Sequence, residues 1–169
     1  MKKISDIHAI KIIFFITACY VGLWAIRIPT IKDQLETDYV GVGYIMLSFA
    51  IGSIVAMIFA NALILKTSTK SILTCTLIAE GCLWLPVPFI QELWLFMVFS
   101  FVFGMSYGAF EIACNVYASN LEVREKKSMM SGFHAFWSLG VLFGSLITSF
   151  LLEWNYSFIF NILMYVIIL

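Results

Sequence analysis

Six long apolar stretches, separated by short polar breaks, constrain this chain more than any other feature. A membrane-spanning helix needs about 20 mainly apolar residues to cross roughly 30 Å of hydrocarbon. By that measure the sequence predicts spans over residues 9–28, 40–65, 71–90, 93–118, 129–152 and 156–169. We therefore expect one all-α membrane domain over residues 1–169, a bundle of six transmembrane helices. The last stretch is short for a full crossing, so its helix is expected to be incomplete or the chain truncated.

Composition supports a bilayer as the solvent. Hydrophobic residues make up 62% of the chain and charged residues only 12%, whereas soluble domains have about 45–50% and about 25%. The net charge is zero, which gives no reason to expect a nucleic-acid partner. No hydrolytic, metal-binding or nucleotide-binding motif is present, so we expect no enzyme activity and no cofactor. The cysteines lie in apolar runs without CxxC pairs, which predicts small buried residues: Cys19, Cys75, Cys82 and Cys114.

The basic residues predict the orientation, because Lys and Arg concentrate on the cytoplasmic side. With alternating spans, one side has only Arg27 and Lys32. The other side collects Lys2, Lys3, Lys11, Lys66, Lys70, Arg124, Lys126 and Lys127. The N-terminus is therefore predicted to be cytoplasmic.

The fourth predicted span carries a polar stripe. Tyr107, Glu111 and Asn115 recur every four residues, so they share one helix face. Acidic residues are rare inside membranes and usually face protein or a water-filled cavity. Desolvation disfavours the charged form of a carboxyl group, which makes Glu111 a candidate for proton coupling or solute binding. The alternative is a structural Glu111 that is hydrogen-bonded to a neighbouring helix.

The fifth span has a smaller polar group. Ser131, His134 and Ser138 lie on one face, and a histidine beside a cavity can titrate or donate hydrogen bonds. His134 and Ser138 are candidate solute contacts. However, His134 lies about one turn from the cytoplasmic end of its span, so a role in gating or in anchoring the loop is an alternative.

The first span carries an aromatic and polar stripe that ends in a cation: Thr17, Tyr20, Trp24 and Arg27. Aromatic faces with hydrogen-bond donors suit a sugar-like or other small polar solute, which makes Tyr20 and Trp24 candidate contacts. Anchoring of Trp24 and Arg27 at the outer membrane surface explains the stripe equally well.

Two further features have no predicted ligand. Glu80 lies near the middle of the third span, and the sequence indicates no partner for it. Small residues such as Gly104 with Gly108 and Gly140 with Gly144 form GxxxG patterns, which let helices approach closely. That pattern predicts helix packing and does not identify a solute.

Three segments resemble the major facilitator superfamily, and more narrowly its bacterial branch related to the fucose permease. These are Trp24–Ser53 with its Arg-x-Pro turn, Gly104–Glu122 with Glu111 and Asn115, and Met130–Ser145, which reads MSGFHAFWSLGVLFGS. The resemblance implies the N-terminal half of a twelve-helix transporter in the bacterial cytoplasmic membrane. That half is built from two inverted three-helix repeats. It also implies that spans one and four line the cavity, whereas spans three and six face lipid, which does not suit Glu80.

One loop departs from the superfamily pattern. The connection between spans two and three, NALILKTSTKS, has Lys66 and Lys70 at the basic positions. It lacks the usual Asp and glycines, so the gating role that the resemblance implies for this loop is in doubt.

Three functions remain open. The first is proton-coupled transport of a small polar solute, for which a sugar is one candidate, by alternating access. The second is a half-transporter that acts only with a missing C-terminal half, a second polypeptide or a second copy. The third is a channel or membrane scaffold, although no filter-like segment is visible.

Overall fold

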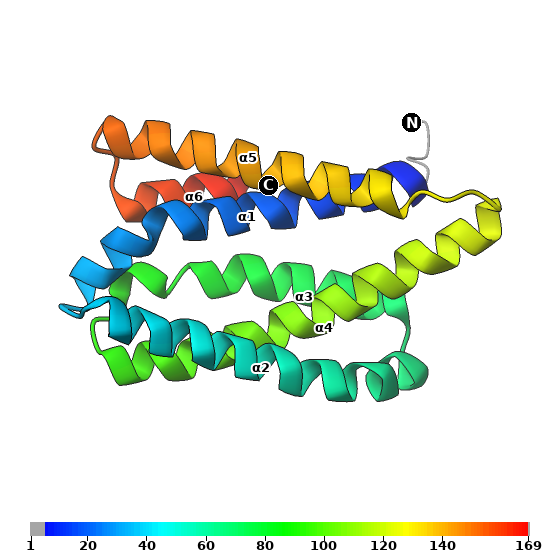
Figure 1. Cartoon of the computed structure of the whole chain (residues 1–169), viewed down its shortest axis with the longest axis horizontal. Helices are drawn as coiled ribbons and strands as arrows, with labels where there is room; N and C mark the ends of the chain where they lie inside the picture. Colours follow the sequence, from blue (N-terminus) through cyan, green and yellow to red (C-terminus); the bar gives the residue numbers. More distant parts are fainter. Residues whose placement is uncertain (1–5, 169) are drawn as a thin grey trace. The chain divides into compact units, whose positions relative to one another are not determined.

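The computed structural model describes residues 6–168, without the side chains of residues 61, 63, 65 and 168. In this part of the chain every regular element is a helix (Figure 1). The elements are α1 (Asp6–Gln34), α2 (Tyr39–Lys66), α3 (Thr69–Trp84), η1 (Val87–Phe89), α4 (Leu93–Glu125), α5 (Met130–Glu153) and α6 (Phe158–Ile168). The predicted all-α fold is confirmed.

Five of the described helical segments are long and apolar enough to cross a membrane. They correspond to α1, α2, α3 with η1, α4 and α5. The sixth, α6, is apolar but has only 11 residues in its helix. This agrees with the short last stretch that the sequence predicts.

Two helices extend beyond their predicted membrane spans. The predicted first span ends at residue 28, and α1 continues through Pro29 to Gln34. Similarly, α4 continues to Glu125, past the predicted end at residue 118. Hydropathy marks where a chain leaves hydrocarbon, whereas a helix ends where its backbone hydrogen bonds end, so polar turns extend both helices.

The third span is also less regular than predicted. The α-helix ends at Trp84, and Pro86 leads into the short helix η1. The side-chain amide of Gln34 donates hydrogen bonds to the carbonyl oxygens of Val87 (2.9 Å) and Ile90 (2.6 Å). These bonds satisfy carbonyl groups that the broken helix leaves open.

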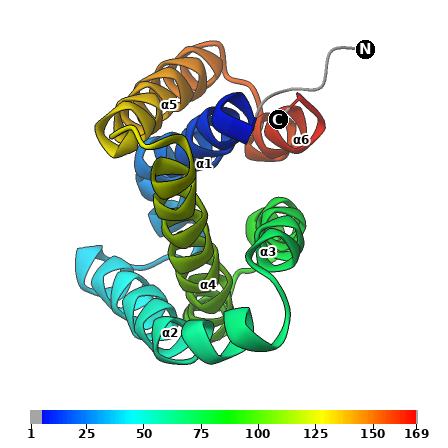
Figure 2. The same ribbon diagram turned by 90° about the vertical axis from the view of Figure 1, so that its right-hand side faces the viewer.

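The described residues form two compact units, and each is described here by itself. Unit 1 comprises residues 6–27 and 115–157, and unit 2 comprises residues 28–114 and 158–168. Both α1 and α4 therefore contribute to both units. In unit 1, α5 packs along α1 (Figure 2). In unit 2, α2 packs against α4 and α3 lies beside α6.

Glycines set the closest helix contacts in both units. In unit 1, Gly140 and Gly144 of α5 lie against the backbone carbonyls of Phe15 and Cys19 on α1. A Cβ at either glycine would overlap those oxygens. The GxxxG pattern thus acts in packing, as predicted.

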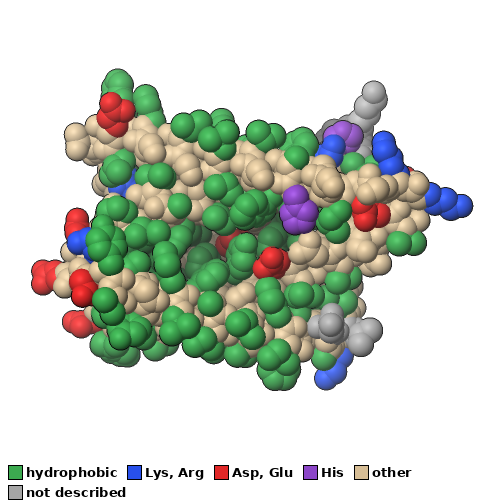
Figure 3. All heavy atoms as spheres, viewed as in Figure 1, with side chains coloured by type: hydrophobic (Ala, Val, Ile, Leu, Met, Phe, Trp, Pro, Cys, Tyr) green, Lys and Arg blue, Asp and Glu red, His purple; other side chains and the backbone are tan. Residues whose placement is uncertain are grey.

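The outer surface is largely apolar. Hydrophobic side chains cover much of the face drawn in Figure 3, and Lys and Arg side chains lie near helix ends. Ile58 is 68% exposed and Ile167 is 79% exposed. Lipid tails accept such a surface, which identifies the chain as a multi-pass membrane protein.

Cys19 and Cys114 are buried as expected, but Cys75 and Cys82 are exposed, because they lie on the outer side of α3.

Candidate functional site: intramembrane acids on α3 and α4

The polar stripe predicted on the fourth span lies on one continuous helix. Tyr107, Glu111 and Asn115 belong to α4, and each is partly buried. The ring of Tyr107 contacts Phe49 of α2, with 5.5 Å between ring centroids. Tyr107 and Glu111 belong to unit 2, whereas Asn115 begins the part of α4 in unit 1.

Glu80 is the acid that sequence reasoning left without a role. The structure buries it on α3, with only 3% of the residue exposed. Within the described residues, its Oε2 atom has no hydrogen-bond partner. One turn further along α3, Trp84 is also buried and packs edge-to-face on Phe103 of α4, at 5.6 Å between centroids. The expectation that this part of the third span faces lipid is therefore wrong for the face that carries Glu80.

The two acids share one electrostatic neighbourhood in unit 2. The hydroxyl of Tyr107 interacts electrostatically with both Glu80 and Glu111. The thiol of Cys114 does the same. A signal for this was present in the sequence, because Glu80 and Trp84 are spaced by four and share a helix face. The sequence did not show which neighbour that face meets.

The predicted residues of the first span are in unit 1. Tyr20 is buried and Trp24 is partly buried on α1. Arg27 is only 2% exposed, and its Nη2 donates a hydrogen bond of 3.4 Å to the carbonyl oxygen of Tyr156. Burial of the guanidinium argues against anchoring of Arg27 at the membrane surface.

The fifth-span candidates are exposed residues of α5. The ring of His134 packs edge-on against Phe14 of α1, with centroids 5.5 Å apart. Ser138 donates a hydrogen bond of 3.1 Å to the carbonyl oxygen of His134. A serine bonded to its own helix in this way remains able to accept a hydrogen bond from a solute.

Comparison with known proteins decides the class. The family Major Facilitator Superfamily matches residues 12–169. The chain belongs to this superfamily. It is 29% identical over 145 residues to an uncharacterized MFS-type transporter of Yersinia pestis, covering 84% of this chain and 37% of that protein. It is 25% identical over 141 residues to an uncharacterized transporter of Sinorhizobium fredii, covering 78% of this chain and 35% of that protein.

The chain thus spans about a third of the length of the curated relatives that it matches. No solved structure matches it. The superfamily match covers the acids on α3 and α4 as well as the candidates on α1 and α5.

In this superfamily member, the α2–α3 loop is short and its lysines are exposed. Lys66 is the last residue of α2, and Lys70 is the second residue of α3. Between them, the Ser68 side chain caps α3 by accepting a hydrogen bond of 3.1 Å from the Ser71 amide. This hydrogen bond satisfies one backbone amide in the first turn of α3.

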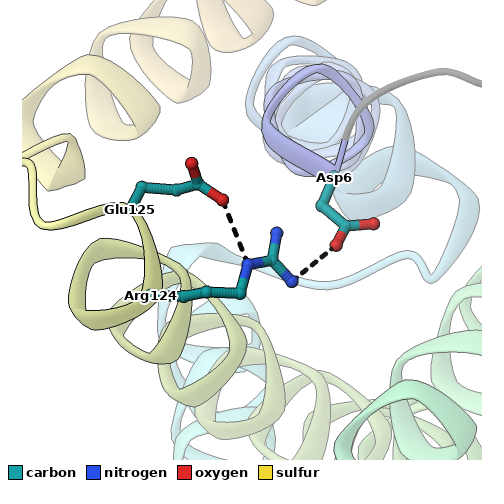
Figure 4. Close-up of polar contacts among 3 residues, drawn as sticks. All are labelled: Asp6, Arg124 and Glu125. Carbon is teal, nitrogen blue, oxygen red and sulfur yellow. Dashed lines mark hydrogen bonds and ion pairs between the residues drawn. The ribbon is translucent and has the colours of Figure 1, made fainter.

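Unit 1 has its own charged group at helix ends (Figure 4). Arg124 in the last turn of α4 forms ion pairs with Asp6 of α1 (2.8 Å) and Glu125 (3.1 Å). The Glu122 carboxylate accepts hydrogen bonds from the amides of Met129 (2.5 Å) and Met130 (2.7 Å). It therefore caps the start of α5. These contacts fix the α4–α5 connection, and sequence reasoning did not predict them.

Proposed function

We propose that this superfamily member takes part in secondary transport of a small polar solute, coupled to protons, with sugars as the first class to test. The observation that supports this is the position of Glu111 on the polar face of α4, beside Tyr107 and near a second acid on α3. Intramembrane acids commonly mark proton and solute pathways in transporters. Glu111 is the proposed proton-coupling residue.

The other candidates have proposed roles in binding and gating. The proposed solute contacts combine aromatic rings with hydrogen-bonding groups: Tyr20, Trp24, Tyr107, Asn115, His134 and Ser138. Arg27, Lys66 and Lys70 have proposed gating or structural roles. Aromatic surfaces with a few placed polar groups are typical of sites for small polar molecules.

Transport by alternating access requires two helix bundles that move about a site between them. The relatives that this chain matches are nearly three times as long as the matched part. We therefore propose that further helices complete the transporter. A C-terminal half, a second polypeptide or a second copy of this chain could provide them, with the bilayer as the surrounding solvent.

The proposed location is the bacterial cytoplasmic membrane, with the N-terminus in the cytoplasm. The described basic residues that support it lie near helix ends or in the α4–α5 connection: Lys11, Lys66, Lys70, Arg124, Lys126 and Lys127. Lys2 and Lys3 lie outside the described residues. A membrane-impermeant thiol reagent should modify a Ser68→Cys variant only from the cytoplasmic side, in a background without the native cysteines. Modification from the outer side only would reverse the proposed orientation.

The test of coupling uses proteoliposomes that contain a pH-sensitive dye. A panel of monosaccharides is added, and solute-driven proton movement is recorded for the wild-type chain and for Glu111→Gln. We expect coupling to fall at least about tenfold in Glu111→Gln, because removing the protonating group removes the linkage. Glu92→Gln is the matched control, since Glu92 is exposed immediately before α4, and it should keep coupling.

Two outcomes would change the proposal. Unchanged coupling in Glu111→Gln would remove Glu111 from the mechanism. Solute movement only after coexpression with a C-terminal half would establish the chain as a half-transporter that is inactive alone. Single-channel currents from purified protein would instead favour a channel.

A further inference from the structure

We propose that Glu80 of α3 is a second proton-binding site, occupied in the conformation described here and linked to Glu111 through their shared neighbour Tyr107. This inference rests on the proposed function in assigning Glu111 the coupling role. It goes further in making α3 part of the proton pathway, whereas the superfamily resemblance assigns α3 to the lipid side.

The first argument is the lack of a counter-charge. The basic residues of unit 2 are Lys32, Lys66 and Lys70, and all lie at or near helix ends. Lys66 and Lys70 are exposed, and Lys32 is paired with Asp33 at 2.7 Å. Burying an ionised carboxylate without a compensating charge is strongly unfavourable, so such a group takes up a proton instead.

The second argument is a buried carboxyl oxygen of Glu80 without a hydrogen-bond donor. An ionised carboxylate inside a protein is normally stabilised by several donors. The Oε2 atom of Glu80 has none among the described residues. Trp84 lies one turn away on the same helix face, and its ring packs against Phe103. This environment fits a neutral carboxylic acid.

The third argument is the second acid. Glu80 and Glu111 both act electrostatically on Tyr107 and Cys114, so a change of charge at either acid is felt by these two shared neighbours. The titratable groups that α4 presents are thus Tyr107, Glu111 and Cys114. The helix α6, which lies beside α3, contributes one titratable residue, the buried Tyr165. None of these provides a positive charge.

Linked acids give a proton two places to reside. In this proposal, a solute or a conformational change that alters the charge of Glu111 acts through Tyr107 on the proton equilibrium at Glu80, and the effect is reciprocal. Tyr107 can both donate and accept a hydrogen bond, and this suits a side chain that is influenced by both carboxyl groups.

The test is infrared spectroscopy of the purified full chain in lipid, which detects the carbonyl stretch of protonated carboxyl groups as pH is varied. We expect the wild type to show a buried protonated carboxyl at neutral pH. Glu80→Gln should lose that signal, and the exposed control Glu92→Gln should keep it. In Glu111→Gln the signal should remain but titrate at a different pH.

The two variants keep the test decisive even if Glu80→Gln does not fold. Glu111→Gln leaves Glu80, the buried acid among the described residues, unchanged, so absence of the signal in that variant would overturn the proposal. An unchanged signal in folded Glu80→Gln would also overturn it. If the signal behaves as expected but proteoliposomes show no solute-driven proton movement, the proposed function fails while the protonation of Glu80 stands.

Discussion

The helix pair α1–α5 in unit 1 and the helix pair α2–α4 in unit 2 are packed by the same device. In the first, Gly140 and Gly144 lie against backbone carbonyls of α1; in the second, Gly104 and Gly108 of α4 lie against those of α2. Small residues permit such close approach in membranes, where burial of apolar surface provides no driving force. The two pairs therefore have a common structural frame.

Their charged residues differ. In unit 1 one group lies at helix ends with partners, as Arg124 does with Asp6, and the buried Arg27 donates to the Tyr156 carbonyl. In unit 2 a buried acid, Glu80, lies one turn before the end of α3, without a hydrogen bond to its Oε2 atom among the described residues. The comparison shows that the same close helix packing can carry different charged groups. Glycine contacts hold the helices together in both units, and the acids on α3 and α4 distinguish unit 2 from unit 1.

The largest effect is expected from a change to the close packing of α2 against α4 in unit 2. A methyl group at Gly52 of α2 would overlap the carbonyl oxygen of Phe101 on α4. We expect Gly52→Ala to destabilise the protein by about 1–3 kcal/mol, because the overlap is with backbone and not with a movable side chain. Thermal unfolding in detergent measures it. Gly43→Ala on the same helix is the control, since nothing lies within 4 Å of its new methyl group.

The corresponding change in unit 1 tests whether α1 and α5 depend on glycine packing as α2 and α4 do. A methyl group at Gly144 would overlap the carbonyl oxygen of Cys19, though less deeply than at Gly52. We expect Gly144→Ala to destabilise by about 1–2 kcal/mol. Gly132→Ala in the same helix has open space around the new methyl and should be neutral or slightly stabilising. If Gly144→Ala were equally neutral, the two helix pairs would not be equivalent.

Much of this frame was predictable from sequence, and much of the site was not. Hydropathy predicted the spans, and four-residue spacing predicted that Tyr107 and Glu111 share a face of α4. Both depend on one helix at a time. The role of Glu80 depends on which helix α3 packs against, and a single sequence carries little information about that. Hydropathy also placed the ends of α1 and α4 too early, since it reports the edge of the hydrocarbon and not the end of a helix.

A smaller effect is expected from the acid that caps α5. Glu122→Ala removes the acceptor for the amides of Met129 and Met130. We expect the midpoint of thermal unfolding to fall by roughly 2–4 °C, as for loss of a helix cap in a protein of this size. Glu122→Gln retains a carbonyl acceptor, so its unfolding midpoint should fall by less than that of Glu122→Ala. Neither variant should change the infrared signal of Glu80, and a change would show that the acids of the two units are not independent.

The smallest effect is expected at Arg124. Its side chain is 56% exposed, and water and salt screen its ion pairs with Asp6 and Glu125. Arg124→Gln should move the unfolding midpoint by no more than about 2 °C, and high salt should remove the difference. Lys126→Gln is a neighbouring control, because Lys126 is an exposed cation two residues further on, just after the end of α4. If Arg124→Gln lowered the unfolding midpoint as much as Gly52→Ala, the charges at helix ends would stabilise unit 1 as strongly as close helix packing stabilises unit 2. In that case the contrast between a packed frame and a separate acid site would hold for unit 2 alone.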